Sequence, residues 1–234
     1  RFLRSSNDTQ LTNRPGTSKS HPMPQVVFEF GTQQHPIPSS FLPNWESSIP
    51  HWKQVHGIRS VEVTLPRQEC GEVDALFCRT PGLPIAIQTA DCVPILMANR
   101  ETRCIAAIHA GWRGTLQGVV QNLWKEIQSS DSSGPEQWEA WVGPSIRSCC
   151  YEVSAELFTE FRNKFSNIQF VKKNFLDLAE INLTILKQLG LNNVSDLSKC
   201  THCSQESGVY TFNSFRRDSS NSRQFSAIKI LDES

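Results

Sequence analysis

Three short segments of this chain place a metal-binding side chain next to a turn. They are Gln54-Val55-His56-Gly57, Thr89-Ala90-Asp91-Cys92-Val93-Pro94 and His109-Ala110-Gly111-Trp112-Arg113-Gly114. In the third segment, His109 ends an apolar run and glycines follow at once, a pattern in which a buried strand delivers a side chain to a site. Two imidazoles and one thiolate, from His56, Cys92 and His109, suit zinc and leave a fourth position open for water, as in catalytic sites.

The spacing of these residues does not by itself establish a metal site. The three lie far apart in the chain, so they form no local metal-binding motif. A lone buried cysteine usually behaves as a small hydrophobic residue, and a lone histidine is usually a hydrogen-bonded structural one. Spacing alone therefore favours the structural interpretation. Asp91 lies between two apolar runs, where a carboxylate is costly unless it is paired or functional, so we expect a compensating partner nearby.

Apolar runs predict the strands that position these side chains. We expect strands at residues 26–30, 84–89, 93–98, 104–108, 209–212 and 226–231, and a proline-rich loop from Pro36 to Pro50. Between residues 54 and 65 the apolar side chains share one parity. In an extended strand this parity would turn His56 away from the core.

Helical spacing of apolar residues predicts helices over 116–127, 153–165 and 178–189, the last ending at Gly190. Strands outnumber helices and do not alternate with them regularly, which favours an α+β fold over a doubly wound α/β fold. We expect a single layered domain of mixed sheets flanked by helices over residues 25–234. Residues 1–24 are polar and are expected to form a mobile tail.

Composition restricts the partners of the protein. The 234 residues include 23 basic and 23 acidic ones, so no overall attraction to nucleic acid or to anionic lipid is indicated, and any anion site must be local. No apolar run is long enough to span a membrane. The eight cysteines are scattered through a large chain and are interpreted as reduced thiols of a cytoplasmic protein. We expect a monomer or a small homo-oligomer.

Several motifs occur in an order that is similar to that of a known family. The chain resembles the YfiH-type family, also called the laccase-domain or multicopper polyphenol oxidase family, over residues 26–231. Besides the three segments above, the matching residues are Val142-Gly143-Pro144-Ser145-Ile146, Cys150-Tyr151-Glu152-Val153, Leu176-Asp177-Leu178 with Asn182, Cys200-Thr201-His202-Cys203 and Phe212-Asn213-Ser214-Phe215-Arg216-Arg217-Asp218.

The resemblance implies a fold, a cofactor and an activity. The fold would be YfiH/CNF1-like, and His56, Cys92 and His109 would bind a catalytic zinc ion, with copper as the alternative. The substrates would be adenosine, inosine and S-methyl-5'-thioadenosine, which phosphate cleaves to a base and a ribose 1-phosphate. Hydrolytic deamination of adenosine would be a second activity.

Individual roles follow from these reactions. Asp91 would carry a proton or orient Cys92, with a purely structural salt bridge as the alternative. Arg113, at the glycine turn before a helix, and Arg216 would hold phosphate, and Arg217 is a further candidate. The structural alternatives for these arginines are a pair on the surface and a salt bridge to Asp218. Cys149-Cys150 is expected in the core, and Cys200-Thr-His-Cys203 in a structural loop, because a second CxxC is absent.

One position departs from the family pattern. Members usually carry a Thr-Arg pair after the first strand, and aligning Thr32 with its threonine places Gln33 where an arginine is expected. Substrate binding would then be weaker. Asn13-Arg14-Pro15-Gly16 offers an alternative match, but no apolar strand precedes it.

Three other functions remain open at this point. A copper-dependent, laccase-like polyphenol oxidase needs a histidine-rich cluster of further coppers, and the chain has six histidines in all. A cysteine hydrolase would use Cys92 as nucleophile and His109 as base, but would have no use for His56. A binding module without enzymatic activity would bind purines and turn none over.

Overall fold

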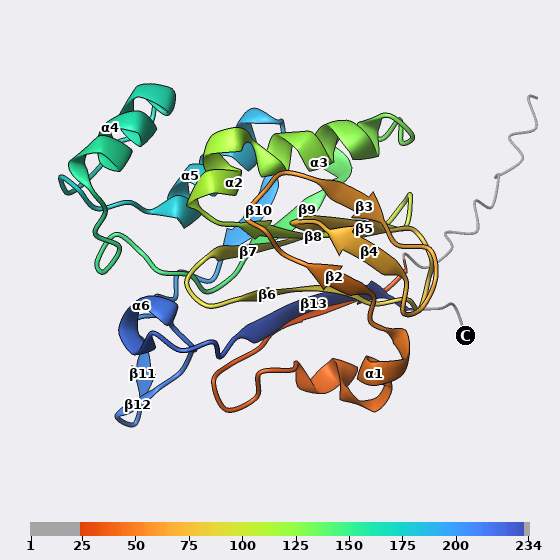
Figure 1. Ribbon diagram of the computed structural model, residues 1–234. Helices are drawn as coiled ribbons and strands as arrows, with labels where there is room; N and C mark the ends of the chain where they lie inside the picture. Colours follow the sequence, from red (N-terminus) through yellow and green to blue (C-terminus); the bar gives the residue numbers. More distant parts are fainter. Residues whose placement is uncertain (1–23, 232–234) are drawn as a thin grey trace, which may run out of the picture.

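Two β-sheets lie face to face at the centre of the molecule (Figure 1). The computed structural model describes residues 24–231. The larger sheet has six strands in the order β10-β9-β7-β8-β5-β3, and the smaller has the order β1-β13-β6. The strands of the larger sheet are β3 (Ser60–Glu62), β5 (Ala75–Cys78), β7 (Val93–Asn99), β8 (Cys104–Ala110), β9 (Glu139–Val142) and β10 (Asn193–Asp196). Those of the smaller are β1 (Val26–Phe30), β6 (Ile85–Thr89) and β13 (Gln224–Ile230).

Helices cover the outer faces of both sheets. The outer face of the larger sheet packs against α2 (Trp112–Gln117), α3 (Val119–Gln128), α4 (Ala155–Lys164) and α5 (Leu178–Gln188). The outer face of the smaller sheet packs against η1 (Ser39–Asn44) and α1 (Trp45–Ser48). Short elements complete the described residues: β2 (His51–Lys53) with β4 (Glu69–Glu72), η2 (Pro135–Gln137), β11 (Gln205–Glu206) with β12 (Val209–Tyr210), and α6 (Phe215–Asp218). The predicted α+β class with mixed sheets is confirmed.

Strand β8 explains how a histidine reaches the space between the sheets. Alternate residues of a strand point to opposite faces. Ala106 and Ile108 belong to the helix-side core, whereas Ile105 and Ala107 belong to the core between the sheets. His109 has the same parity as Ile105 and Ala107, so its ring lies on the inter-sheet side, near the end of β8, and it is 3% exposed.

Most predicted strands and helices are present, with three corrections. The Pro36–Pro50 segment is not only a loop, because it contains η1 and α1. The strand expected at 209–212 is reduced to two residues, Val209–Tyr210. The helix expected over 116–127 starts earlier, at Trp112, and is divided by Gly118, whose φ of 91° ends α2 and begins α3.

The alternation expected between residues 54 and 65 is also wrong in part. Residues 54–59 connect β2 to β3 and are not a strand. Val55 is 40% exposed and Leu65 is 64% exposed, although both were expected on the core face. His56 has a φ of 61°, in the left-handed region, so a turn and not an extended strand determines where its ring points.

The expected mobile tail, apart from residue 24, lies outside the described residues, and the single domain over 25–234 stays a prediction. No helix within residues 24–231 has the length and apolar character that a membrane crossing needs.

Candidate metal centre and cavity

His56, Cys92 and His109 meet at one end of the two sheets. One ligand atom from each lies within 4.8 Å of the others. His56 comes from the turn between β2 and β3, Cys92 from the bend between β6 and β7, and His109 from β8. The antiparallel register of β7 and β8 pairs Val93 with Ala110 and thereby brings Cys92 next to the end of β8. The spacing in sequence gave no local motif, and pairing between strands assembles the group.

Asp74 holds two of these three residues in place and was not among the expected site residues. One carboxylate oxygen, Oδ1, lies 2.7 Å from His109 Nδ1 and accepts the backbone N–H of His56 at 2.9 Å. The other, Oδ2, accepts the N–H groups of Gly57 at 2.7 Å and Val55 at 3.2 Å. Although burial opposes it, these hydrogen bonds lower the pKa of Asp74, so the residue is a carboxylate at neutral pH.

The contact with Asp74 sets the orientation of the His109 ring. Because Nδ1 is held by the carboxylate, Nε2 is the ring nitrogen left for a metal ion, and such a carboxylate contact is usual for metal-binding histidines. The sequence carried one signal for this role, since Asp74 immediately precedes the buried strand Ala75–Cys78, where a carboxylate needs a partner.

Gly111 keeps the space beside the three residues free. A Cβ atom at this position would lie 2.9 Å from His56 Cδ2 and 3.1 Å from Cys92 Sγ. Its φ of -75° and ψ of 175° are open to any residue, so the requirement for glycine comes from this close approach and not from the backbone. The donor set, the oriented ring and the space kept by Gly111 fit a bound metal ion.

Cys92 and His109 shift each other's titration in the metal-free chain. Burial opposes both charges, but the adjacent His109 and His56 lower the pKa of Cys92 to about 6. The Cys92 thiolate and Asp74 raise the pKa of His109 to about 9, again against the effect of burial. A thiolate at neutral pH is the form that binds metal and the form that acts as a nucleophile.

Asp91 has the compensating partners that its burial requires. Oδ1 accepts the Thr201 hydroxyl at 2.7 Å, and Oδ2 accepts the backbone N–H of Arg216 at 2.7 Å. Its φ is 89°. Asp91 therefore links the β6–β7 bend that carries Cys92 to two segments near the C-terminal end of the chain.

A cavity of about 600 Å³ opens over the three candidate ligands. Its other polar and charged lining residues include Lys53, Gln88, Thr89, Arg216, Asn221 and Arg223, and its aromatic ones are Trp52, Trp112, Tyr151 and Phe215. Lys53 is paired with Glu72 at 2.7 Å. Arg216 donates to the Glu152 carbonyl at 2.8 Å and lies over the Tyr151 ring. The volume is in the range of small-molecule sites.

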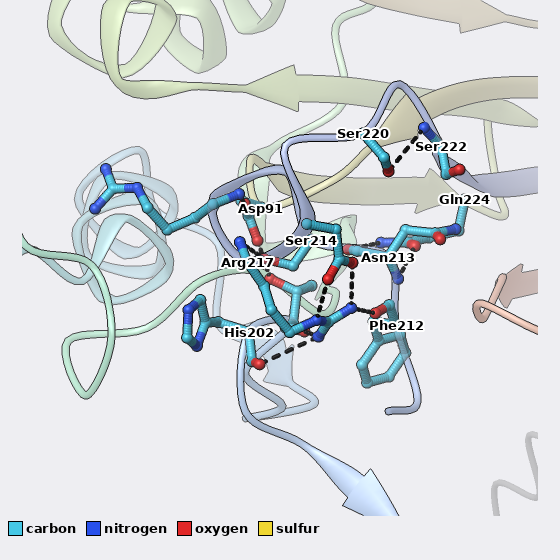
Figure 2. A network of polar contacts seen from close by, with 12 residues as sticks. Asp91, His202, Phe212, Asn213, Ser214, Arg217, Ser220, Ser222 and Gln224 are labelled. Carbon is cyan, nitrogen blue, oxygen red and sulfur yellow. Dashed lines mark hydrogen bonds and ion pairs between the residues drawn. The ribbon is translucent and has the colours of Figure 1, made fainter. Parts of the chain in front are cut away.

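The structure separates the arginines expected to hold phosphate. Arg113 is exposed, its guanidinium lies over the Trp112 ring, and it is not among the described residues that line the cavity. Arg216 lines the cavity. Figure 2 shows Arg217 in a different setting, donating to the carbonyls of Phe212 and His202. It also pairs with Asp218 at 2.7 Å, which is the structural bridge considered as its alternative.

Gln33 lies away from this cavity. It is exposed, its backbone N–H donates to the Thr211 carbonyl at 2.8 Å, and it is absent from the described lining residues. The alternative match around Arg14 lies outside the described residues.

The fold and the site together define an α+β protein with a mixed histidine–cysteine cluster that fits a metal ion at the base of a cavity. Residues 42–231 match a family model described as multi-copper polyphenol oxidoreductase laccase, and the chain belongs to this family. The resemblance stated from the motifs is thereby confirmed.

Named relatives are similar over most of this chain. The protein named purine nucleoside phosphorylase YfiH from Shigella flexneri is 34% identical over 190 residues, 79% of this chain and 75% of that protein. The protein of the same name from Escherichia coli (strain K12) is 33% identical over 190 residues, with the same shares covered. The crystal structure of the hypothetical protein YfiH from Bacillus licheniformis has a TM-score of 0.70 and 27% identity, and covers 78% of this chain and 74% of that one.

Proposed function

We propose that this chain is a zinc-dependent purine nucleoside phosphorylase. Its substrates are adenosine, inosine and S-methyl-5'-thioadenosine, which phosphate cleaves to the free base and a ribose 1-phosphate. The observation that carries the proposal is the group of His56, Cys92 and His109 at the base of a cavity that also contains arginine and aromatic side chains. The names of the relatives from Shigella flexneri and Escherichia coli support the same activity.

The cavity offers the contacts that a nucleoside and phosphate need. Trp112, Tyr151 and Phe215 present aromatic surface to a purine. Gln88 and Asn221 add polar side chains to the same wall. Arg216 and Arg223 supply positive charge for phosphate.

Phosphorolysis transfers the ribosyl group from the base to phosphate. A phosphate oxygen forms the bond to C1', the bond from C1' to N9 breaks, and its electron pair leaves with the purine, which takes up a proton. The sugar is cationic in the transition state, so an anion held beside it by Arg216 and Arg223 is stabilising. Arg113 remains a prediction for this role, but its position over Trp112 does not support it.

We also propose hydrolytic deamination of adenosine as a second activity. When bound by His56, Cys92 and His109, zinc supplies a Lewis acid that lowers the pKa of water toward about 7. In deamination, water adds at C6 of the purine and ammonia leaves, which yields inosine. We assign Asp91 a positioning role here, because both of its oxygens already accept hydrogen bonds from Thr201 and Arg216.

The experiment is incubation of the purified protein with adenosine, with and without phosphate, with separation of adenine from inosine. We expect adenine that requires phosphate, together with a smaller amount of inosine that does not. If neither product forms although adenosine binds, the binding module without activity is the better conclusion.

The Cys92→Ser variant tests the cysteine-hydrolase alternative. A cysteine hydrolase is favoured by one observation, the low pKa of Cys92 next to His109. If Cys92 is a ligand, the variant loses zinc and turnover together; zinc retained with activity lost would identify a nucleophile. A multicopper oxidase is not supported among the described residues, because the other metal-competent group has four cysteines and no histidine.

We also propose a cytoplasmic location, because none of the eight cysteines forms a disulfide bond, which is usual in that compartment.

A further inference from the structure

A second group of possible metal ligands lies apart from the first and consists of four cysteines. The Sγ atoms of Cys149, Cys150, Cys200 and Cys203 all lie within 4.8 Å of one another. The expectation that Cys149-Cys150 packs in the core is wrong, since Cys149 is exposed and Cys150 is half-buried. The CxxC pair at 200–203 has no CxxC partner, as the sequence indicated, but the adjacent pair at 149–150 takes that place.

Backbone contacts bring these two segments together without involving the sulfur atoms. Ser145 and Cys200 form an isolated parallel bridge. The Ser145 N–H donates to the Lys199 carbonyl at 3.2 Å, and the Thr201 N–H donates to the Ser145 carbonyl at 3.0 Å. Arg147, between Ser145 and Cys149, is held by Asp177 at 3.1 Å and by Asp196 at 3.0 Å. The four thiols are therefore presented by a fixed backbone, as preorganised metal ligands are.

The distance between two of the sulfur atoms fits a tetrahedral metal site and not a disulfide bond. Cys149 Sγ lies 3.8 Å from Cys203 Sγ. A disulfide bond is only about 2.05 Å long. Four sulfurs at about 2.3 Å from a tetrahedral zinc ion are about 3.8 Å apart, because each sulfur–sulfur edge is about 1.63 times the bond length.

We propose that Cys149, Cys150, Cys200 and Cys203 bind one zinc ion in a closed, structural site. Four thiolates fill the tetrahedron and leave no position for water, in contrast to the open group at His56, Cys92 and His109. The two sites would differ in role. The group at His56, Cys92 and His109 would take part in catalysis, whereas the four-cysteine site would hold the segments around 149–150 and 200–203 together.

The four-cysteine site is connected to the cavity on both sides. Ile146 and Tyr151, which flank Cys149 and Cys150, line the cavity. On the other segment, Thr201 donates to Asp91, the neighbour of Cys92, and Figure 2 shows Arg217 joined to the adjacent His202 carbonyl. A metal ion at the cysteines would therefore hold the Tyr151 wall of the cavity against the Asp91 bend.

The first experiment measures the zinc content of the full chain, purified under reducing conditions without added metal. We expect close to two zinc ions per chain. Cys149→Ser/Cys203→Ser should lose one and keep the ion at His56, Cys92 and His109, whereas Cys92→Ser should lose the other. Cys70→Ala, which removes a buried thiol outside both groups, should keep two.

A second measurement uses the unsubstituted protein, in case the double variant does not fold. Thiols are alkylated with and without prior treatment with a strong chelator, and the modified positions are mapped by mass spectrometry. We expect Cys149 and Cys203, although exposed, to be protected before chelation and modified after it. Cobalt added to the chelated protein should give an intense thiolate-to-cobalt charge-transfer band that is retained in Cys92→Ser.

Specific outcomes overturn the proposal. Unprotected Cys149 and Cys203 in a protein with no second zinc would show free thiols. A mass lower by two hydrogens, restored by reductant, would show a disulfide. Since Cys92→Ser tests the first site separately, failure of the proposed catalytic zinc would not be mistaken for failure of this one.

Discussion

Asp74 illustrates how much of the site depends on one residue outside the expected ligand set. Its two oxygens accept hydrogen bonds from three backbone N–H groups and contact the ring of His109. The same carboxylate thus orders the turn that carries His56 and orients the ring of His109. At the residue scale, the geometry of the metal group is fixed by this carboxylate as much as by the ligands themselves.

Asp74→Asn should be strongly disruptive although it is isosteric. Either orientation of the amide would point an NH2 group at N–H donors, leaving buried groups unsatisfied at a cost of about 1–3 kcal/mol each. We expect metal affinity to fall by about 10–100-fold, measured by competition with a chelator, and urea unfolding to show reduced stability. An unchanged metal affinity would contradict the orienting role.

Asp91→Asn should be tolerated, in contrast. Its amide oxygen can accept the Arg216 N–H while its NH2 group donates to the Thr201 hydroxyl, which can act as acceptor, and asparagine accommodates a positive φ. We expect kcat to change by only a few-fold, roughly, whereas Asp91→Ala, which removes both acceptors, should be destabilised. A loss of about 10²–10⁴ in kcat for a stable Asp91→Asn protein would identify Asp91 as a proton carrier.

The reactivity of Cys92 in the chelated, metal-free protein should depend on pH in an unusual way. Its pKa of about 6 lies below the ordinary value of about 8.5, so the thiolate is present above pH 6 and is lost as the pH falls through 6. We expect the rate of alkylation by iodoacetamide to level off already by about pH 7. Cys104, whose pKa burial raises to about 12, should stay unreactive over the same range. A rate for Cys92 that still rises around pH 8.5 would contradict the pairing with His109.

At the scale of elements, the turn from β8 to α2 acts as one wall of the metal group. His109 ends the apolar part of β8, Gly111 follows two residues later, and α2 begins at Trp112. The abrupt change from strand to helix leaves room for the ring of His56 and the sulfur of Cys92 only because residue 111 has no side chain. The strand, the turn and the helix are therefore a single functional unit.

Gly111→Ala should weaken metal binding while leaving the fold intact. The added Cβ would meet His56 Cδ2 at 2.9 Å and Cys92 Sγ at 3.1 Å, so one of the two ligands must move. Gly57→Ala is the matched control, because its Cβ would make only ordinary contacts, the nearest at 3.5 Å. We expect reduced zinc affinity for Gly111→Ala and near-normal affinity for Gly57→Ala, by chelator competition, with similar thermal unfolding. If the two variants bind zinc with equal affinity, the turn from β8 to α2 adjusts to the added methyl group, and the close approach at Gly111 is not required.

At the scale of the whole molecule, apolar patterning accounts for the core. The runs at 85–89, 93–99 and 104–110 are buried strands because most of their side chains belong to one of three apolar clusters. The three candidate ligands followed from residue type and family motif. Their spacing could not show how they meet, since pairing between strands decides it.

Other features of the structure could not be predicted from the sequence, for physical reasons that the structure shows. The ring of His56 is positioned by a left-handed turn that alternation cannot describe. Gly118 divides a helix whose apolar face continues across the break, so periodicity alone shows one helix. Cys149-Cys150 and Cys200–Cys203 are brought together by the bridge between Ser145 and Cys200, a long-range contact that leaves no local pattern.

The assembly of His56, Cys92 and His109 from two connections and one strand has a consequence for when the protein can acquire metal. Because these residues converge only after β5, β7 and β8 have paired, an unfolded chain offers no chelating segment that contains all three. Metal must then be acquired by the folded molecule, and its binding favours the native state by mass action, by about 2.7 kcal/mol at a hundredfold excess over Kd. A metal ion bound at this site would therefore mark a molecule that has already folded.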